Sequence, residues 1–98
     1  MAAASGNTVT TSGTGGSDHL VLGDGLFHLH VTWAGSAGDA DLQVGDGTNW
    51  IDAEDSSGAI NITADKAVIV HGGASYRLDV NTHTSAATMT AHNVSNND

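Results

Sequence analysis

A short hairpin in the middle of the chain limits the possible folds more than any other feature of the sequence. Leu42 and Val44 stand two residues apart, so they share one face of an extended strand. The Gly-Asp-Gly stretch at 45–47 then supplies the left-handed backbone conformations that a tight turn demands. A second strand opens with Trp50, whose large apolar side chain we expect to join a core of small residues. This pattern predicts a compact antiparallel β module.

The clearest single strand is Leu26–Trp33, in which apolar and polar residues alternate with a period of two. Its apolar residues are predicted to face inward, and His28 and His30 to face outward. Further short strands are predicted over 19–22, 39–44, 49–53, 59–63, 67–71, 75–80 and 87–92, with glycine-rich turns between them and no helical periodicity. The sequence therefore predicts an all-β fold, a small antiparallel β-sandwich or jelly-roll-like module. The expected core consists of Phe27, Leu29, Val31, Trp33, Leu42, Val44, Ile60, Ile62, Tyr76, Leu78 and Val80.

Composition divides the chain into three parts. Residues 1–16 are rich in Ala, Ser, Gly and Thr, and we expect a flexible N-terminal arm there. Residues 17–93 form the predicted sandwich domain, and 94–98 a polar C-terminal tail. Within the arm, Thr8, Val9, Thr10 and Thr11 have strand propensity, so they are predicted to add to an exposed sheet edge of a partner.

Size and charge restrict the partners. The 98 residues include few large apolar side chains and no cysteine, so the core is thin and has no disulfide. We therefore expect a homo-oligomer, with a trimer as the most reasonable guess, or a subunit bound to a lattice. A formal net charge of −9 argues against nucleic acid and anionic membranes as partners. The first residues lack the features of a signal peptide, which predicts synthesis in a cytoplasm.

Histidine is the one chemically unusual feature of the composition. His28 and His30 stand two apart on one strand face and could present two imidazoles to a metal, with a third from His19, from His92 or from another copy in an oligomer. A pH-responsive interface is another possibility, since histidine changes charge near neutral pH. Solvent-facing histidines on a polar sheet face are the favoured interpretation, so no metal ligand is predicted. The complete set is His19, His28, His30, His71, His83 and His92.

Acidic residues gather around the central hairpin, at Asp39, Asp41, Asp46, Asp52, Glu54 and Asp55. They lack the spacing of a calcium-binding loop, so solvated turns are favoured over a calcium site. The chain also lacks a nucleophile elbow and a phosphate-binding loop before a helix. We therefore expect no enzyme, no catalytic residues and no cofactor. Trp33 and Trp50 could stack against a sugar, but a place in the core is favoured for both.

Five stretches carry a resemblance to a known group of proteins: Val31–Gly35, Ala40–Gln43, Asp46–Trp50, Tyr76–Val80 and Ala87–Ala91. Their order is similar to that in small accessory virion proteins of tailed bacteriophages, and the resemblance covers residues 26–92. It implies a β-sandwich that decorates a capsid or belongs to a tail or fibre, and it implies no catalytic residues.

The expected function is that of a non-enzymatic structural virion protein, specifically a capsid decoration or cement protein on the outer capsid surface. The expected partners are the major capsid protein or other virion proteins. One alternative is a tail, neck or fibre subunit of a phage. An alternative from another class is a carbohydrate-binding module that uses Trp50 together with nearby acidic and amide groups.

Overall fold

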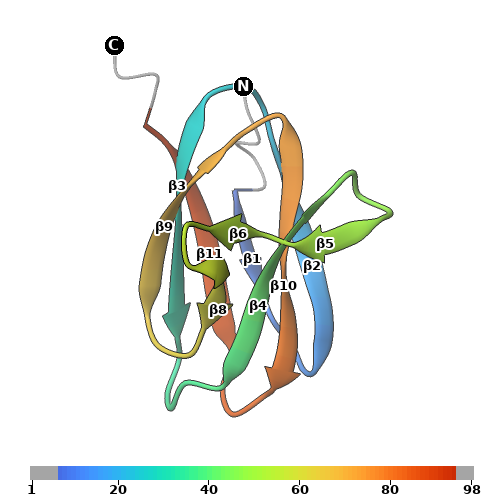
Figure 1. The fold of residues 1–98 in the computed structure, drawn as a ribbon. Helices are drawn as coiled ribbons and strands as arrows, with labels where there is room; N and C mark the ends of the chain where they lie inside the picture. Colours follow the sequence, from blue (N-terminus) through green and yellow to red (C-terminus); the bar gives the residue numbers. More distant parts are fainter. Residues whose placement is uncertain (1–6, 95–98) are drawn as a thin grey trace.

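The computed structural model describes residues 7–94, and in this range it is an all-β sandwich of two antiparallel sheets without a helix (Figure 1). Sheet A has the strand order β1 (Thr8–Thr10), β11 (Ala87–Asn93), β3 (Leu26–Trp33) and β9 (Lys66–His71). Sheet B has the order β2 (Gly15–Leu22), β10 (Ala74–Thr82), β4 (Asp39–Gly45) and β5 (Trp50–Asp52), and β8 (Asn61–Ile62) also pairs with β4. The predicted fold class is confirmed.

A small hairpin lies apart from both sheets. It consists of β6 (Glu54–Asp55) and β7 (Gly58–Ala59), which pair only with each other among the described residues. The sequence predicts this segment as a turn-rich loop. Gly58 has a φ of 114°, which favours glycine and allows the tight turn after β6. The hairpin therefore leaves sheet B without a long strand at this edge.

The core lies between the two sheets and follows the predicted alternation. Every predicted core residue faces this interior, with Val44 only partly buried at its margin. The inward face of β11 adds Met89, and that of β2 adds Leu20 and Leu22, all buried. Because side chains alternate along each strand, the same register that buries these residues directs the side chains between them to the outer faces.

The prediction of a flexible arm is wrong for residues 7–16. Thr8 and Thr10 lie opposite Thr90 and Thr88 of β11, so this segment is an edge strand of the protein's own sheet. Val9 packs against the core. The strand predicted to add to a partner therefore pairs with β11 of its own chain. The sandwich domain begins at β1, not at residue 17, and β2 begins at Gly15.

Thr11 fixes the end of this strand. The residue is buried, its N–H donates to the carbonyl of Ala87 at 2.8 Å, and its hydroxyl accepts from the N–H of Ala87, also at 2.8 Å. The predicted interface of Thr8–Thr11 is therefore occupied on its β11 side. The remaining parts of the predicted arm and tail, residues 1–6 and 95–98, lie outside the described residues.

We predict that Thr11→Ala destabilises the domain by about 1–3 kcal/mol, because the buried N–H of Ala87 loses its acceptor. Thr11→Ser keeps the hydroxyl and should cost less. Urea-induced unfolding of the two variants measures the difference. Equal stability of the alanine and serine variants would contradict the assigned hydrogen bond.

Candidate functional site

The outer face of sheet A carries no Asp, Glu, Lys or Arg among the described residues. Its side chains alternate with the core residues of four strands, so their position follows from the sheet register. We call this surface the threonine–histidine face. It consists of Thr8, Thr10, Leu26, His28, His30, Thr32, Ala67, Ile69, His71, Thr88, Thr90 and His92.

Threonine pairs occupy one half of this face. The hydroxyl oxygens of Thr8 and Thr90 lie 3.3 Å apart, and those of Thr10 and Thr88 lie 3.2 Å apart. Such cross-strand pairs contribute to sheet stability and hold the side chains in fixed positions. The threonine half of the face is therefore polar without formal charge.

Histidines occupy the other half. The ring centre of His30 lies 5.5 Å from that of His28 and 5.1 Å from that of His92. The structure thus brings His92 beside the predicted pair, but it does not bring His19, which lies on sheet B. Among residues 7–94, no group of three or more His, Asp or Glu side chains is arranged to hold a metal ion. We therefore assign no metal site here.

The outer face of sheet B differs in charge. It carries the carboxylates of Asp39, Asp41, Asp52 and Asp79 together with Arg77. The two faces of the sandwich are therefore unlike: one has no Asp, Glu, Lys or Arg among the described residues, and the other is acidic.

Trp50 lies on this acidic face, so the prediction that it joins the core is wrong. It pairs with Gly45 across β4 and β5, and this register directs its ring outward. The guanidinium carbon of Arg77 lies 4.7 Å from the ring centre, and the ring of His19 lies 5.3 Å away. Trp33, by contrast, is buried as predicted, and its indole Nε1 has no hydrogen-bond partner.

Arg77 is held over Trp50 by a short polar network. Its Nε donates to Oε1 of Gln43 at 2.8 Å, and Nε2 of Gln43 donates to Oδ1 of Asp52 at 3.2 Å. A cation stacked on an indole ring is a stable arrangement in itself. A sugar that stacked on the same side of the ring would have to displace Arg77, so this geometry does not favour a carbohydrate platform.

Gly45 provides the space that Trp50 occupies. A Cβ atom at this position would collide with the backbone carbonyl of Asn49 and would lie 3.0 Å from the indole ring. A Cβ atom at Gly35, by contrast, would make only ordinary contacts, the nearest at 3.6 Å to Ser85. The two glycines therefore form a matched pair for substitution.

We predict that Gly45→Ala destabilises the domain by about 1–3 kcal/mol, because the added methyl group displaces Trp50 and the hairpin backbone. The indole fluorescence spectrum should change with it. Gly35→Ala should leave both properties near the wild-type values. Thermal unfolding followed by fluorescence measures both, and equal effects of the two substitutions would contradict the packing described.

Asp39 and Asp41, near the start of β4, are held by hydrogen bonds from two asparagines. The amide of Asn61 donates to Asp39 at 2.7 Å and to Asp41 at 2.9 Å, and the amide of Asn81 donates to the same two carboxylates. The hydrogen bond from Asn61, then that from Asn81, lowers the pKa of Asp39. Asp46 lies in the turn, as the solvated-turn interpretation predicts, whereas Asp39, Asp41 and Asp52 lie in strands β4 and β5.

The carboxylate of Asp46 accepts the backbone N–H groups of Asn49 at 2.8 Å and Thr48 at 2.9 Å. These two hydrogen bonds, in that order, lower the pKa of Asp46 below its usual value. A lowered pKa in the folded state means that the group contributes stability above its unfolded pKa and loses it as pH falls through the folded pKa.

We therefore predict that Asp46 titrates below the ordinary aspartate value of 3.8. The stability difference between the wild type and Asp46→Asn should shrink as pH falls from about 5 to about 2. Carboxyl NMR titration and thermal unfolding over this range test the two parts. A difference that stays constant with pH would show that the charge of Asp46 does not act on the turn.

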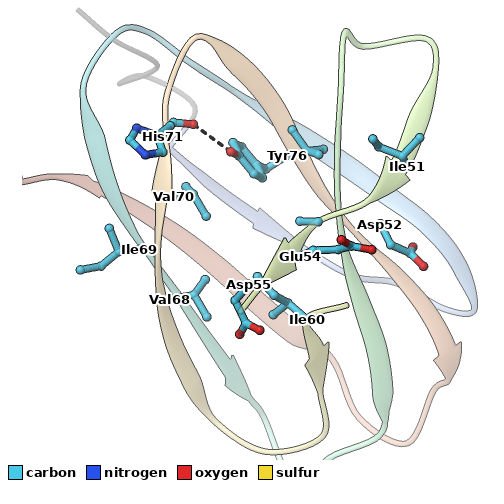
Figure 2. A pocket seen from close by; sticks show the side chains of 12 residues that line it. Ile51, Asp52, Glu54, Asp55, Ile60, Val68, Ile69, Val70, His71 and Tyr76 are labelled. Atoms are coloured by element: carbon cyan, nitrogen blue, oxygen red, sulfur yellow. Dashed lines mark hydrogen bonds between the residues drawn. The ribbon is translucent and has the colours of Figure 1, made fainter. Parts of the chain in front are cut away.

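A groove opens along the edge of the sandwich between β9 and the β5–β6 segment (Figure 2). Its volume is about 770 Å³, which lies in the range of ligand-binding cavities. Apolar side chains form much of its wall, and three carboxylates stand on one side. The lining residues are Val44, Ile51, Asp52, Ala53, Glu54, Asp55, Ile60, Val68, Ile69, Val70, His71 and Tyr76.

Tyr76 closes one end of the groove. Its hydroxyl donates to the backbone carbonyl of His71 at 2.8 Å, as the dashed line in Figure 2 shows. Burial raises the pKa of Tyr76 above its usual value. Sequence reasoning missed this groove, and the only signal for it was the turn-rich stretch at 54–58 that forms the β6–β7 hairpin.

Comparison of the chain with protein-family models, curated proteins and solved structures finds no match. Over the residues described, no helix has the length and apolar character to cross a membrane.

Proposed function

We propose that this chain is a non-enzymatic structural virion protein of a tailed bacteriophage, and specifically a capsid decoration or cement protein. Its partner is the major capsid protein or another protein of the virion, and its location is the outer capsid surface. The resemblance of residues 26–92 to small accessory virion proteins supports this class.

The observation that carries the proposal is the contrast between the two sheet faces. The chain has a formal net charge of −9, yet the threonine–histidine face has no carboxylate, lysine or arginine. The centres of protein interfaces are depleted in charged residues. This face therefore suits contact with a lattice of other proteins, while the acidic face of sheet B suits exposure to solvent.

The proposal includes self-association, with a trimer as the expected state. The interior is built from few large side chains, and Ile51 and Ile69 remain exposed by 60% or more. Small domains with thin cores gain stability from contact with further copies or with a lattice. Sedimentation velocity of the purified protein tests this part, and a stable monomer at high concentration would contradict it.

Location in the virion tests the class directly. We predict that mass spectrometry detects the chain in purified particles of the phage that encodes it, and that immunogold labelling places it on the capsid. Labelling on the tail, neck or fibres would instead support the alternative subunit. Absence from purified particles would contradict the whole proposal.

A charge placed on the threonine–histidine face tests the contact surface. Thr90→Glu should weaken binding to particles that lack the protein by about ten-fold or more, because it puts an unpaired carboxylate into the contact. The matched variant Val21→Glu adds the same charge on the outer face of sheet B, where Val21 is 61% exposed, and should bind as the wild type does. Equal binding of both variants would contradict the use of sheet A.

A further inference from the structure

The edge of β9 that faces the groove has no partner strand among the described residues. Sheet A ends at this strand, which pairs with β3 on one side only. An edge strand with free N–H and C=O groups is a template for the addition of another strand. The backbone groups on the outer edge of β9 are therefore available to pair with a further strand.

The hydrogen-bond pattern shows which groups are free. The N–H of Gly72 donates to the carbonyl of Gly25, so Leu26 and His71 form a non-hydrogen-bonded pair of the antiparallel ladder. The pattern alternates along the strand, so Ala67 and Ile69 also direct their backbone groups away from β3. The carbonyl of His71, on the same side, already accepts from Tyr76.

The groove beside this edge has the volume to receive side chains. Val68 and Val70 point from β9 toward the interior, and Ile60 and Tyr76 lie across from them (Figure 2). A strand placed along β9 would direct every second side chain onto this apolar wall. Its other side chains would lie beside Ile69, which is 60% exposed on the outer face of sheet A.

The charges of the groove select the kind of strand. Glu54 and Asp55 stand on the side opposite β9, and the lining includes no Lys or Arg. Lys66 begins β9 but lies outside the lining. Complementary charge favours a partner segment that carries basic residues, and would disfavour an acidic one such as another copy of this chain, with its net charge of −9.

We propose that the groove is a binding site for an extended, basic segment of another polypeptide, which adds to the free edge of β9 as a further strand of sheet A. Main-chain hydrogen bonds to Ala67 and Ile69 supply general affinity. Apolar side chains in the groove and basic side chains near Glu54 and Asp55 supply selectivity. This proposal does not depend on the virion assignment.

Selection from a displayed library of random peptides of about eight residues tests the proposal without a known partner. The enriched peptides should alternate apolar residues with others and should contain Lys or Arg. In NMR spectra, the amide signals of Ala67 and Ile69 should shift most when a selected peptide binds. Enrichment of acidic peptides, or no enrichment at all, would overturn the proposal.

Two sets of variants identify the contact. Ala67→Pro removes an N–H group that faces the free edge, and should weaken peptide binding by about ten-fold or more, whereas Ala67→Ser keeps this group and should bind normally. Glu54→Gln combined with Asp55→Asn should weaken binding about three- to ten-fold. The control pair Asp18→Asn and Asp79→Asn makes the same change of charge on β2 and β10 and should have no effect.

The charge variants keep the test decisive if Ala67→Pro fails to fold. Equal binding of the two charge pairs would overturn the selection for basic segments. A dimer of the wild type that Ala67→Pro converts to a monomer would assign the edge to a second copy of the chain and would also overturn the proposal. Particle binding of the Thr90→Glu variant does not enter this test, so the two proposals can fail separately.

Discussion

The alternation of inward and outward side chains in β3, β10 and β11 is the constraint on which the rest of the structure depends. These strands bury Leu29, Leu78 and Met89 completely and place polar residues between them. A slip of one residue in any of them would exchange the core for the outer surface. The chemistry of both outer faces is therefore determined by the same register that builds the core. The uncharged face of sheet A and the acidic face of sheet B are thus two consequences of one packing pattern.

The two lateral edges of the sandwich are built differently. On one side, β1 and β2 follow each other in the chain and lie in contact across the two sheets, so the interior is covered there. On the other side, the chain leaves sheet B after β5 and forms the β6–β7 hairpin before it returns to β4 as β8. Neither β6 nor β7 pairs with β9, and the space left between this hairpin and β9 forms the groove. The opening thus results from the path of residues 53–60.

The sequence was sufficient to predict the fold class and the core, because the alternation of apolar and polar residues can be recognised within each strand without knowledge of strand order. It was insufficient for Trp50 and for Thr8–Thr11, because both depend on which strand lies next to which. Trp50 points outward because it pairs with Gly45, and no local pattern distinguishes this register from the opposite one. The N-terminal segment has the composition of a flexible arm, but its threonines pair with the edge of β11. The groove could not be predicted for the same reason, because its two walls come from segments that are separate in the sequence.

Four of the six histidines lie on the outer face of sheet A. His28, His30, His71 and His92 come from three strands and meet on one face, where no carboxylate among the described residues compensates a positive charge. This face carries hydrogen-bonding groups and, among the described residues, no carboxylate, lysine or arginine. A strand added at β9 would extend the same face beyond Ala67 and Ile69, because added strands continue the pleat of the sheet. Contact through the face and contact through the edge are therefore geometrically compatible, and one partner that supplied both a surface and an extended segment would bury them together.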